Sequence, residues 1–217
     1  MTAPRAHFPP NELATQGARV SGTVLDVSQL PSYAFGQRSL MWWGTLGIVA
    51  IEGTVFALAV MTYFYLRTLA DEWPMGSPAP RLLWGTLNLA VVLLSAIPNH
   101  WTKGAAERHD LGRVRAGLFV CLVFALVAIA LRFFEFTALN VAWDTNAYGS
   151  VVWLLLGLHT LHLVTDFVDS VVLYVLMLRD PVAGKRFVDV SENAMYWDFV
   201  VFAWIPIYLV IYWGARL

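Results

Sequence analysis

Residues 40–66 read LMWWGTLGIVAIEGTVFALAVMTYFYL and carry a single charged side chain, Glu52. An α-helix needs about 20 mainly apolar residues to cross the hydrocarbon core of a bilayer. This stretch therefore predicts a transmembrane helix, and it is the first of several such stretches in the chain.

Four further runs meet the same requirement, although the second is short and ends in Ile97-Pro98-Asn99-His100. The segments between them contain helix breakers, including Asp180-Pro181 and Gly184. We expect an all-α, polytopic helix bundle at residues 39–217. Its five predicted spans lie at 40–66, 82–101, 116–139, 148–178 and 193–213.

The composition of the whole chain agrees with a membrane protein. Of its 217 residues, 59% are hydrophobic and 13% are charged, whereas soluble domains carry about a quarter charged residues. A net charge of −1 gives no general attraction for nucleic acid. The single cysteine, Cys121, excludes an intrachain disulfide and a cysteine-rich metal site.

Lysine and arginine predict the orientation, because cytoplasmic loops carry an excess of both. Residues 1–38 are polar, contain four prolines and lack the apolar core of a signal peptide, so we interpret them as a cytoplasmic tail. With the N-terminus inside and the C-terminus outside, three basic residues fall outside: Arg67, Arg81 and Arg216. The inner segments hold ten: Arg5, Arg19, Arg38, Lys103, Arg108, Arg113, Arg115, Arg179, Lys185 and Arg186.

Ionisable residues inside the spans are candidates for function, because they are costly in a bilayer. Glu52 lies near the middle of the first span. It is interpreted either as a carboxyl that handles protons or contacts a partner subunit, or as a neutral acid hydrogen-bonded to a neighbouring helix. Arg132 and Glu135 share a helix face at spacing i, i+3 and predict a buried ion pair. The alternative is that Arg132 meets a lipid phosphate or a partner's carboxylate.

The fourth span carries a stripe of His159, His162, Asp166 and Asp169, whose spacings of 3, 4 and 3 place them on one helix face. We predict a hydrogen-bonded polar seam, with proton conduction as the alternative. A metal site is not expected, because the helical zinc pattern is absent. A bis-histidine haem would need a second helix, for which only His100 is available.

The remaining residues offer no catalytic equipment. Asp198, one turn into the predicted last span, is interpreted as an interfacial carboxylate near a helix N-terminus. Neither a nucleophile triad, a phosphate loop nor a dinucleotide fingerprint is visible, so no catalytic residue is assigned.

Four segments, in order, resemble subunit III of the haem–copper oxidases. Residues 148–162, YGSVVWLLLGLHTLH, resemble that family's YGS and GxHxxH segment. Residues 132–136, RFFEF, are similar to a segment that ends in glutamate and an aromatic residue. The first span resembles a helix with a buried glutamate, and residues 196–200, YWDFV, resemble the final YWHFVD helix.

The resemblance implies a short, five-helix bacterial form in the cytoplasmic membrane. Such a subunit binds no redox centre itself and packs beside catalytic subunit I, which carries the haems and copper, in a complex with subunit II. Its buried glutamate, matched by Glu52, supports proton uptake and protects the active site from inactivation. Phospholipids lie between its helices, with Arg132 as a candidate contact.

The chain departs from the family pattern at several positions. Asp198 stands for a histidine, Val201 for an aspartate and Thr160 for a glycine, while Asp166 and Asp169 are additional. An accessory subunit of a quinol oxidase or nitric oxide reductase system therefore remains an alternative. A stand-alone transporter or channel is the alternative from another class.

Overall fold

The protein is described by a computed structural model that covers residues 33–179 and 182–217. Residues 1–32 of the predicted tail, and Asp180-Pro181 of the last linker, lie outside the described residues. Over the described ranges the chain forms five long α-helices and no β-strand, in one compact unit at residues 32–217. The helices are α1 (Leu40–Leu69), α2 (Leu82–Glu107), α3 (Leu111–Thr137), α4 (Ala147–Leu178) and α5 (Lys185–Tyr208). A short 3-10 helix, Gly36–Arg38, precedes α1, and a π-helical turn, Leu209–Trp213, continues α5.

All five helices, in the part of the chain that the structure describes, are long and apolar enough to cross a membrane. The predicted all-α fold with five spanning helices is thereby confirmed, and the chain is a multi-pass membrane protein. Polar caps define three helix starts, because a side-chain oxygen can accept from an otherwise unpaired backbone N–H. Ser39 accepts from Met41 N, Asp110 from Arg113 N and Asn146 from Gly149 N.

The helices extend beyond the predicted spans where they carry charge. The helix start predicted at Asp189, Ser191 and Glu192 was wrong, because α5 begins at Lys185. Its charged first turns lower the local hydropathy, yet they also bury Phe187 and Val190 against α2 and α3. Likewise, α2 and α3 extend until only three residues separate them, in a tight turn with His109 at φ 56°.

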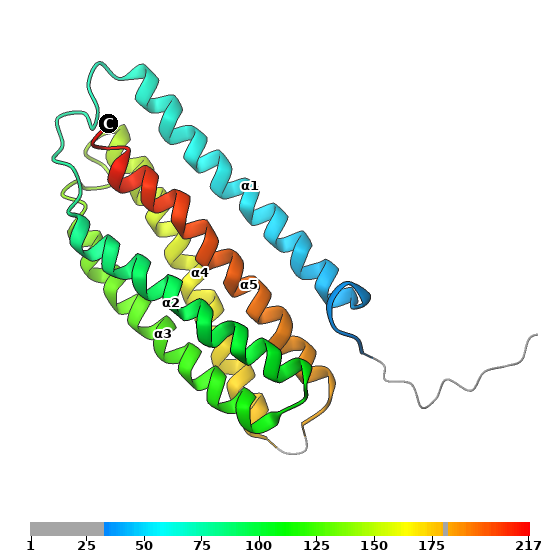
Figure 1. Ribbon diagram of the computed structural model, residues 1–217. Coiled ribbons are helices and arrows are strands. Elements are labelled where there is room, and N and C mark those ends of the chain that lie inside the picture. The colour runs from blue at the N-terminus through cyan, green and yellow to red at the C-terminus, as the bar shows by residue number, and fades with distance from the viewer. Residues whose placement is uncertain (1–32, 180–181) are drawn as a thin grey trace, which may run out of the picture. The chain divides into compact units, whose positions relative to one another are not determined.

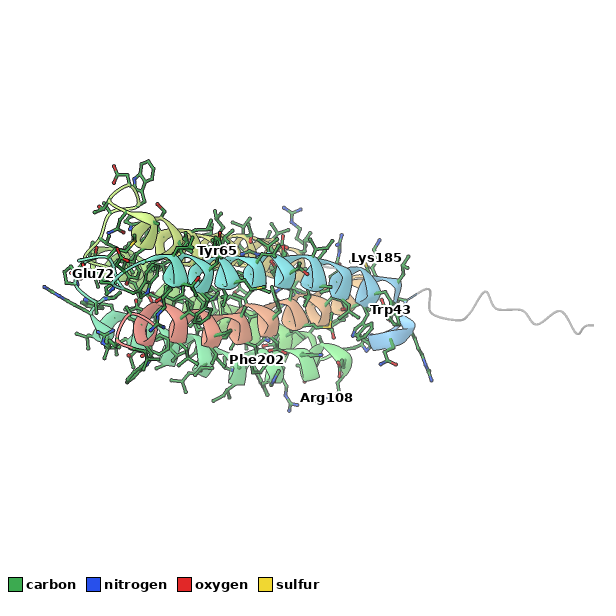
Figure 2. The ribbon with its side chains drawn as sticks, turned by 90° about the horizontal axis from the view of Figure 1, so that it is seen from above. Trp43, Tyr65, Glu72, Arg108, Lys185 and Phe202 are labelled. Carbon is green, nitrogen blue, oxygen red and sulfur yellow. The ribbon has the colours of Figure 1, made fainter. Side chains whose placement is uncertain are left out.

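Neighbouring helices alternate in direction, so α1, α3 and α5 begin at one end of the bundle. We name this the Lys185 end and the opposite one the Glu72 end. Figure 2 shows Trp43 and Lys185 together at the first and Glu72 at the second.

Helix α1 is attached more loosely than the others. It lies at the edge of the bundle, beside α4 and α5, while α2 packs against α3 and α5 (Figure 1). Its buried side chains are Phe56, Ala59 and Tyr63, and residues 40–55 contain none. The half of α1 at the Lys185 end therefore stands clear of the core.

The two loops at the Glu72 end are cross-connected and hold the helix ends together. Trp73 Nε1 donates to the buried Tyr63 hydroxyl over 2.8 Å, and Asn146 Nδ2 donates to Ser77 Oγ over 3.1 Å. Arg81 N donates to the carbonyl of Ala138 over 3.0 Å. This end is thus fixed by contacts between loops as well as between helices.

Candidate functional site

The polar residues inside the bundle include two hydrogen-bonded groups, the first of which we name the core cluster: Asn88, Arg132, Glu135, His159 and Tyr212. Arg132 Nη1 lies 2.7 Å from Glu135 Oε2, and the two side chains are 1% and 0% exposed. Glu135 also accepts from Asn88 Nδ2 and from the Tyr212 hydroxyl, each over 2.8 Å. Three donors from three helices thus converge on one carboxylate, as a buried charge requires.

His159 extends the core cluster to α4, and its hydrogen bonds determine its tautomer. Its Nδ1 lies 2.8 Å from Arg132 Nη2, and its Nε2 lies 3.0 Å from the carbonyl oxygen of Val200. A guanidinium can only donate and a carbonyl can only accept. His159 is therefore a neutral imidazole with its proton on Nε2, and both ring nitrogens are engaged within the chain.

The guanidinium of Arg132 is enclosed on its remaining side by an aromatic ring. Its Cζ lies 4.0 Å from the centroid of the Trp204 ring, a cation–π distance. With 1% exposure, the side chain is turned into the bundle, where Glu135 and His159 bind it. The geometry is that of an intrachain ion pair held by four helices.

The second group surrounds Glu52. Its Oε2 accepts from the Tyr196 hydroxyl over 2.8 Å and lies 3.5 Å from His162 Nε2. His162 Nδ1 is 2.6 Å from the carbonyl oxygen of Leu158 and must donate to it. His162 therefore presents its other ring nitrogen, Nε2, to the carboxyl group of Glu52.

The predicted stripe on α4 is unevenly buried. His159 and Asp166 are buried, whereas His162 lies partly exposed beside Glu52 of α1 and Asp169 is exposed. Asp166 and Asp169 line the same groove between α1, α4 and α5. The 3-4-3 spacing placed all four on one side of the helix but did not indicate how deeply each would be buried.

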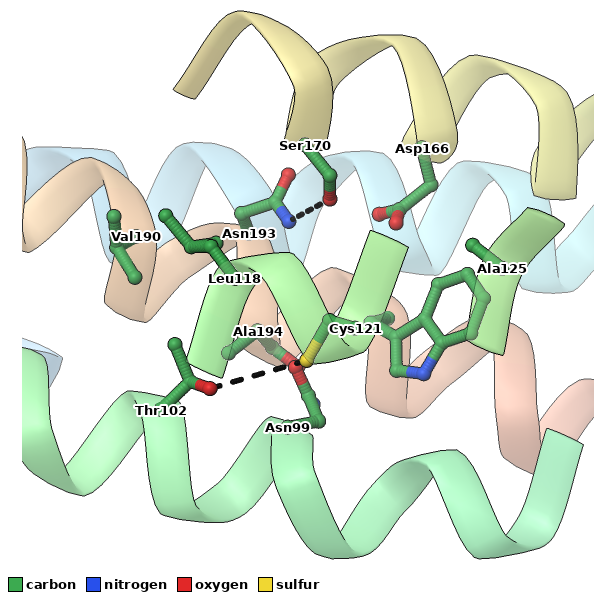
Figure 3. Close-up of a pocket in the computed structure, with 11 residues that line it drawn as sticks. Asn99, Thr102, Leu118, Cys121, Ala125, Asp166, Ser170, Val190, Asn193 and Ala194 are labelled. Carbon is green, nitrogen blue, oxygen red and sulfur yellow. Dashed lines mark hydrogen bonds between the residues drawn. The ribbon is translucent and has the colours of Figure 1, made fainter. Parts of the chain in front are cut away.

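Asp166 borders a small internal cavity, shown in Figure 3. The cavity has a volume of ≈ 10 Å³, room for about one water molecule. Asp166 Oδ1 has no hydrogen-bond partner among the described residues, while Asn193 Nδ2 donates to Ser170 Oγ over 3.0 Å. On the other side, Thr102 Oγ1 lies 3.8 Å from Cys121 Sγ.

A much larger groove separates the loose half of α1 from α4 and α5. Its volume is ≈ 510 Å³, and we name it the acidic groove because five carboxyl groups and one guanidinium line it. The charged lining residues are Glu52, Asp166, Asp169, Asp189, Glu192 and Arg186; the others are Met41, Thr45, Ile48, Thr165, Val172, Leu173, Leu176, Asn193 and Tyr196.

Asp198 is placed differently from the prediction. Because α5 starts at Lys185, Asp198 lies about four turns into the helix and not at its N-terminus. It accepts from Asn99 Nδ2 over 2.9 Å and lies 3.5 Å from His100 Nδ1. The histidine considered as a second haem ligand therefore faces a carboxylate. Over residues 33–179 and 182–217, no group of three or more metal-ligating side chains is arranged to hold a metal ion.

Several residues of these sites went unnoticed in the sequence because they carry no charge. Asn88 and Asn99 lie within an apolar span, where an amide must find partners on other helices, and that cost was a usable signal. Nothing local to Tyr196 and Tyr212 in the sequence indicates their bonds to Glu52 and Glu135.

Comparison with known proteins agrees with the resemblance over nearly the whole helical region. The family model described as cytochrome c oxidase subunit III matches residues 39–216. Cytochrome c oxidase subunit 3 of Synechocystis sp. is 24% identical over 82% of this chain and 77% of its own length. The proteins of that name from Locusta migratoria and Artemia franciscana are also 24% identical, over 79% and 84% of this chain and 68% and 70% of their own lengths. The chain belongs to the cytochrome c oxidase subunit III family.

Proposed function

We propose that this chain is the non-catalytic subunit III of a terminal respiratory haem–copper oxidase of the cytochrome c oxidase type. The observation that carries the proposal is the family match over residues 39–216. The buried charges support it, because Arg132 binds both Glu135 and His159 within the chain. A side chain engaged in this way stabilises a scaffold and is not free to react with a substrate.

The partners follow from the family. The chain packs beside catalytic subunit I, in a complex that also contains subunit II, and binds membrane phospholipids. The haems and copper belong to the catalytic subunit, and this chain contributes no ligand to them. A stand-alone transporter is not favoured, and neither is a quinol oxidase or nitric oxide reductase subunit, because the relatives described above share the name cytochrome c oxidase subunit 3.

The site proposed to act on the catalytic subunit is Glu52. Its carboxyl group lies 3.5 Å from His162 Nε2, on a helix whose residues 40–55 include no buried side chain. We assign it to sustained proton uptake by the complex and to protection of the active site during turnover. The core cluster is assigned to stability.

The bundle is proposed to sit in the bacterial cytoplasmic membrane with the Lys185 end inside and the C-terminus outside. The excess of lysine and arginine in the segments at the Lys185 end supports this orientation.

Two fusions at the C-terminus test the orientation. An alkaline phosphatase fusion should be active, and a green fluorescent protein fusion should not fluoresce. The opposite pair of results would reverse the orientation.

Co-purification tests the function directly. The tagged full-length chain, extracted in a mild detergent, should bring down a haem–copper catalytic subunit that mass spectrometry identifies. The complex should show haem absorption, and the chain separated from it should show none. A chain that purifies alone and carries haem would contradict the proposal.

A further inference from the structure

We propose that the acidic groove binds a linear aliphatic polyamine, a ligand whose ammonium groups are joined by methylene segments. The groove lies between residues 41–52 of α1 and the facing sides of α4 and α5. No residue of α1 between 40 and 55 is buried against the bundle, so the space is built into the packing of the helices.

Charge is the first argument for a cationic ligand. Glu192 is 5% exposed, and its Oε2 has no hydrogen-bond partner among the described residues. Asp166 is 3% exposed, and its Oδ1 also has no hydrogen-bond partner among the described residues. Arg186, the one cation in the lining, already binds Asp189 over 3.0 Å. Lys103 interacts with Glu192 from α2 but does not line the groove. A buried carboxylate oxygen without a hydrogen-bond partner is costly, and an ammonium group would relieve that cost.

The arrangement of the carboxyl groups selects an elongated ligand. Counting residues along the helices puts Asp189 nearest the Lys185 end, Glu192 and Asp169 farther along, and Asp166 with Glu52 farthest from it. The distance along α1 from Met41 to Glu52 is about 16 Å at 1.5 Å per residue. Carboxyl groups distributed along such a length suit several separated charges. They do not converge on one point, and the described residues contain no group suited to a metal ion.

The uncharged lining favours methylene segments between those charges. Apolar side chains from α1 and α4 alternate with the carboxyl groups along the groove, namely Met41, Ile48, Val172, Leu173 and Leu176. A methylene chain can contact these side chains while its nitrogens reach the carboxylates. A hydrated metal ion would leave this apolar surface uncovered.

The ethanolamine headgroup of a phospholipid offers the same ammonium chemistry but fits the groove less well. It carries one ammonium group beside a phosphate, and Asp189, Glu192 and Asp169 would repel that phosphate. Arg186, which could offset the repulsion, is paired with Asp189. The charge pattern therefore favours the free polyamine over the lipid.

Spermidine is the probe for the test. Its binding to the full-length chain, in the detergent-purified complex, is measured by equilibrium dialysis at constant ionic strength. We expect saturable binding of one spermidine per chain. Asp169→Asn and Glu192→Gln should each weaken it about tenfold or more, because each removes a hydrogen bond between charged groups. Asp144→Asn, the same change at an exposed carboxyl outside the groove, should leave binding unchanged.

Three results would overturn the proposal. The first is equal affinity of the wild type and the Asp169→Asn variant for spermidine. Because Asp169 is exposed, this variant does not disturb the core. Complete displacement of spermidine by Mg²⁺ at the same ionic strength would show non-specific screening. Loss of binding in nanodiscs containing phosphatidylethanolamine, but not in those of phosphatidylcholine alone, would assign the groove to the lipid. Because binding is measured apart from oxidase activity, none of these results depends on the function of the complex.

Discussion

The hydroxyl of Tyr196 on α5 donates a 2.8 Å hydrogen bond to Oε2 of Glu52 on α1. The bond lies at the depth where packing of α1 begins, since Phe56 is its first buried residue from the Lys185 end. Glu52 is thus both a candidate proton site and an attachment point for a loosely held helix.

Tyr196→Phe should loosen that attachment. The change removes one hydrogen bond to a carboxyl group while keeping the ring, so we expect the free energy of unfolding to fall by about 1–2 kcal/mol. Unfolding of the purified chain in a detergent titration measures it. Tyr65→Phe is the matched control, because Tyr65 is 63% exposed. Equal losses in the two variants would show that the bond contributes nothing.

Glu52→Gln should separate the proton role from the structural one. The glutamine oxygen can still accept from Tyr196, but an amide cannot take up or release a proton as a carboxyl group can. We expect a near-normal initial oxidase rate with a shorter working lifetime or a lower proton stoichiometry. Progress curves and proton pumping in reconstituted vesicles measure both, with Asp144→Asn as the control. Unchanged lifetime and stoichiometry would remove Glu52 from proton handling.

The Arg132–Glu135 pair should be strongly coupled. Arg132→Met leaves Glu135 buried without its cation, and breaking a buried pair in this way costs about 3–5 kcal/mol. Glu135→Gln leaves the opposite charge unpaired. The double variant should be less destabilised than the sum of the two by at least about 1 kcal/mol, in a double-mutant cycle on the free energy of unfolding. Additive effects would mean that the two charges act independently.

Two helix glycines should respond oppositely to alanine. A Cβ on Gly85 would overlap the Tyr212 ring, which donates to Glu135, whereas no atom lies within 4 Å of the corresponding position at Gly157. Gly85→Ala should therefore cost about 1–3 kcal/mol by overpacking. Gly157→Ala should be neutral or stabilising by up to about 1 kcal/mol, since alanine favours helix. Thermal unfolding of both variants measures the difference, and equal melting temperatures would contradict the packing at Gly85.

The sequence predicted the helices because an apolar run of sufficient length has few alternatives in a membrane. Hydropathy placed the start of α5 too late, because Lys185, Arg186 and Asp189 mask a helix whose opposite face is buried. Where charge and burial alternate within a turn, hydropathy averaged over a window loses the boundary.

Partners across helices could not be predicted in the same way. The i, i+3 spacing of Arg132 and Glu135 was sufficient for their pairing, since both lie on one helix. The bonds from Asn88 and Tyr212 depend on the rotation and axial position of other helices. The residues around Glu135 in the sequence determine neither the rotation nor the axial position of those helices. The acidic groove was missed for the same reason, because its carboxyl groups come from three helices.

The core cluster also bears on the order in which the chain enters the membrane. An arginine within a membrane span is costly to insert, and α3 is synthesised before α4 and α5 supply His159 and Tyr212. Because Glu135 lies one turn from Arg132, the part of α3 that follows Arg115 can enter the bilayer as an electrically neutral segment that brings its own counterion. The later helices then arrive at a polar site already present in the lipid. Tyr212, five residues from the end of the chain, supplies the last bond to Glu135, so a nascent chain truncated before it would lack this final connection.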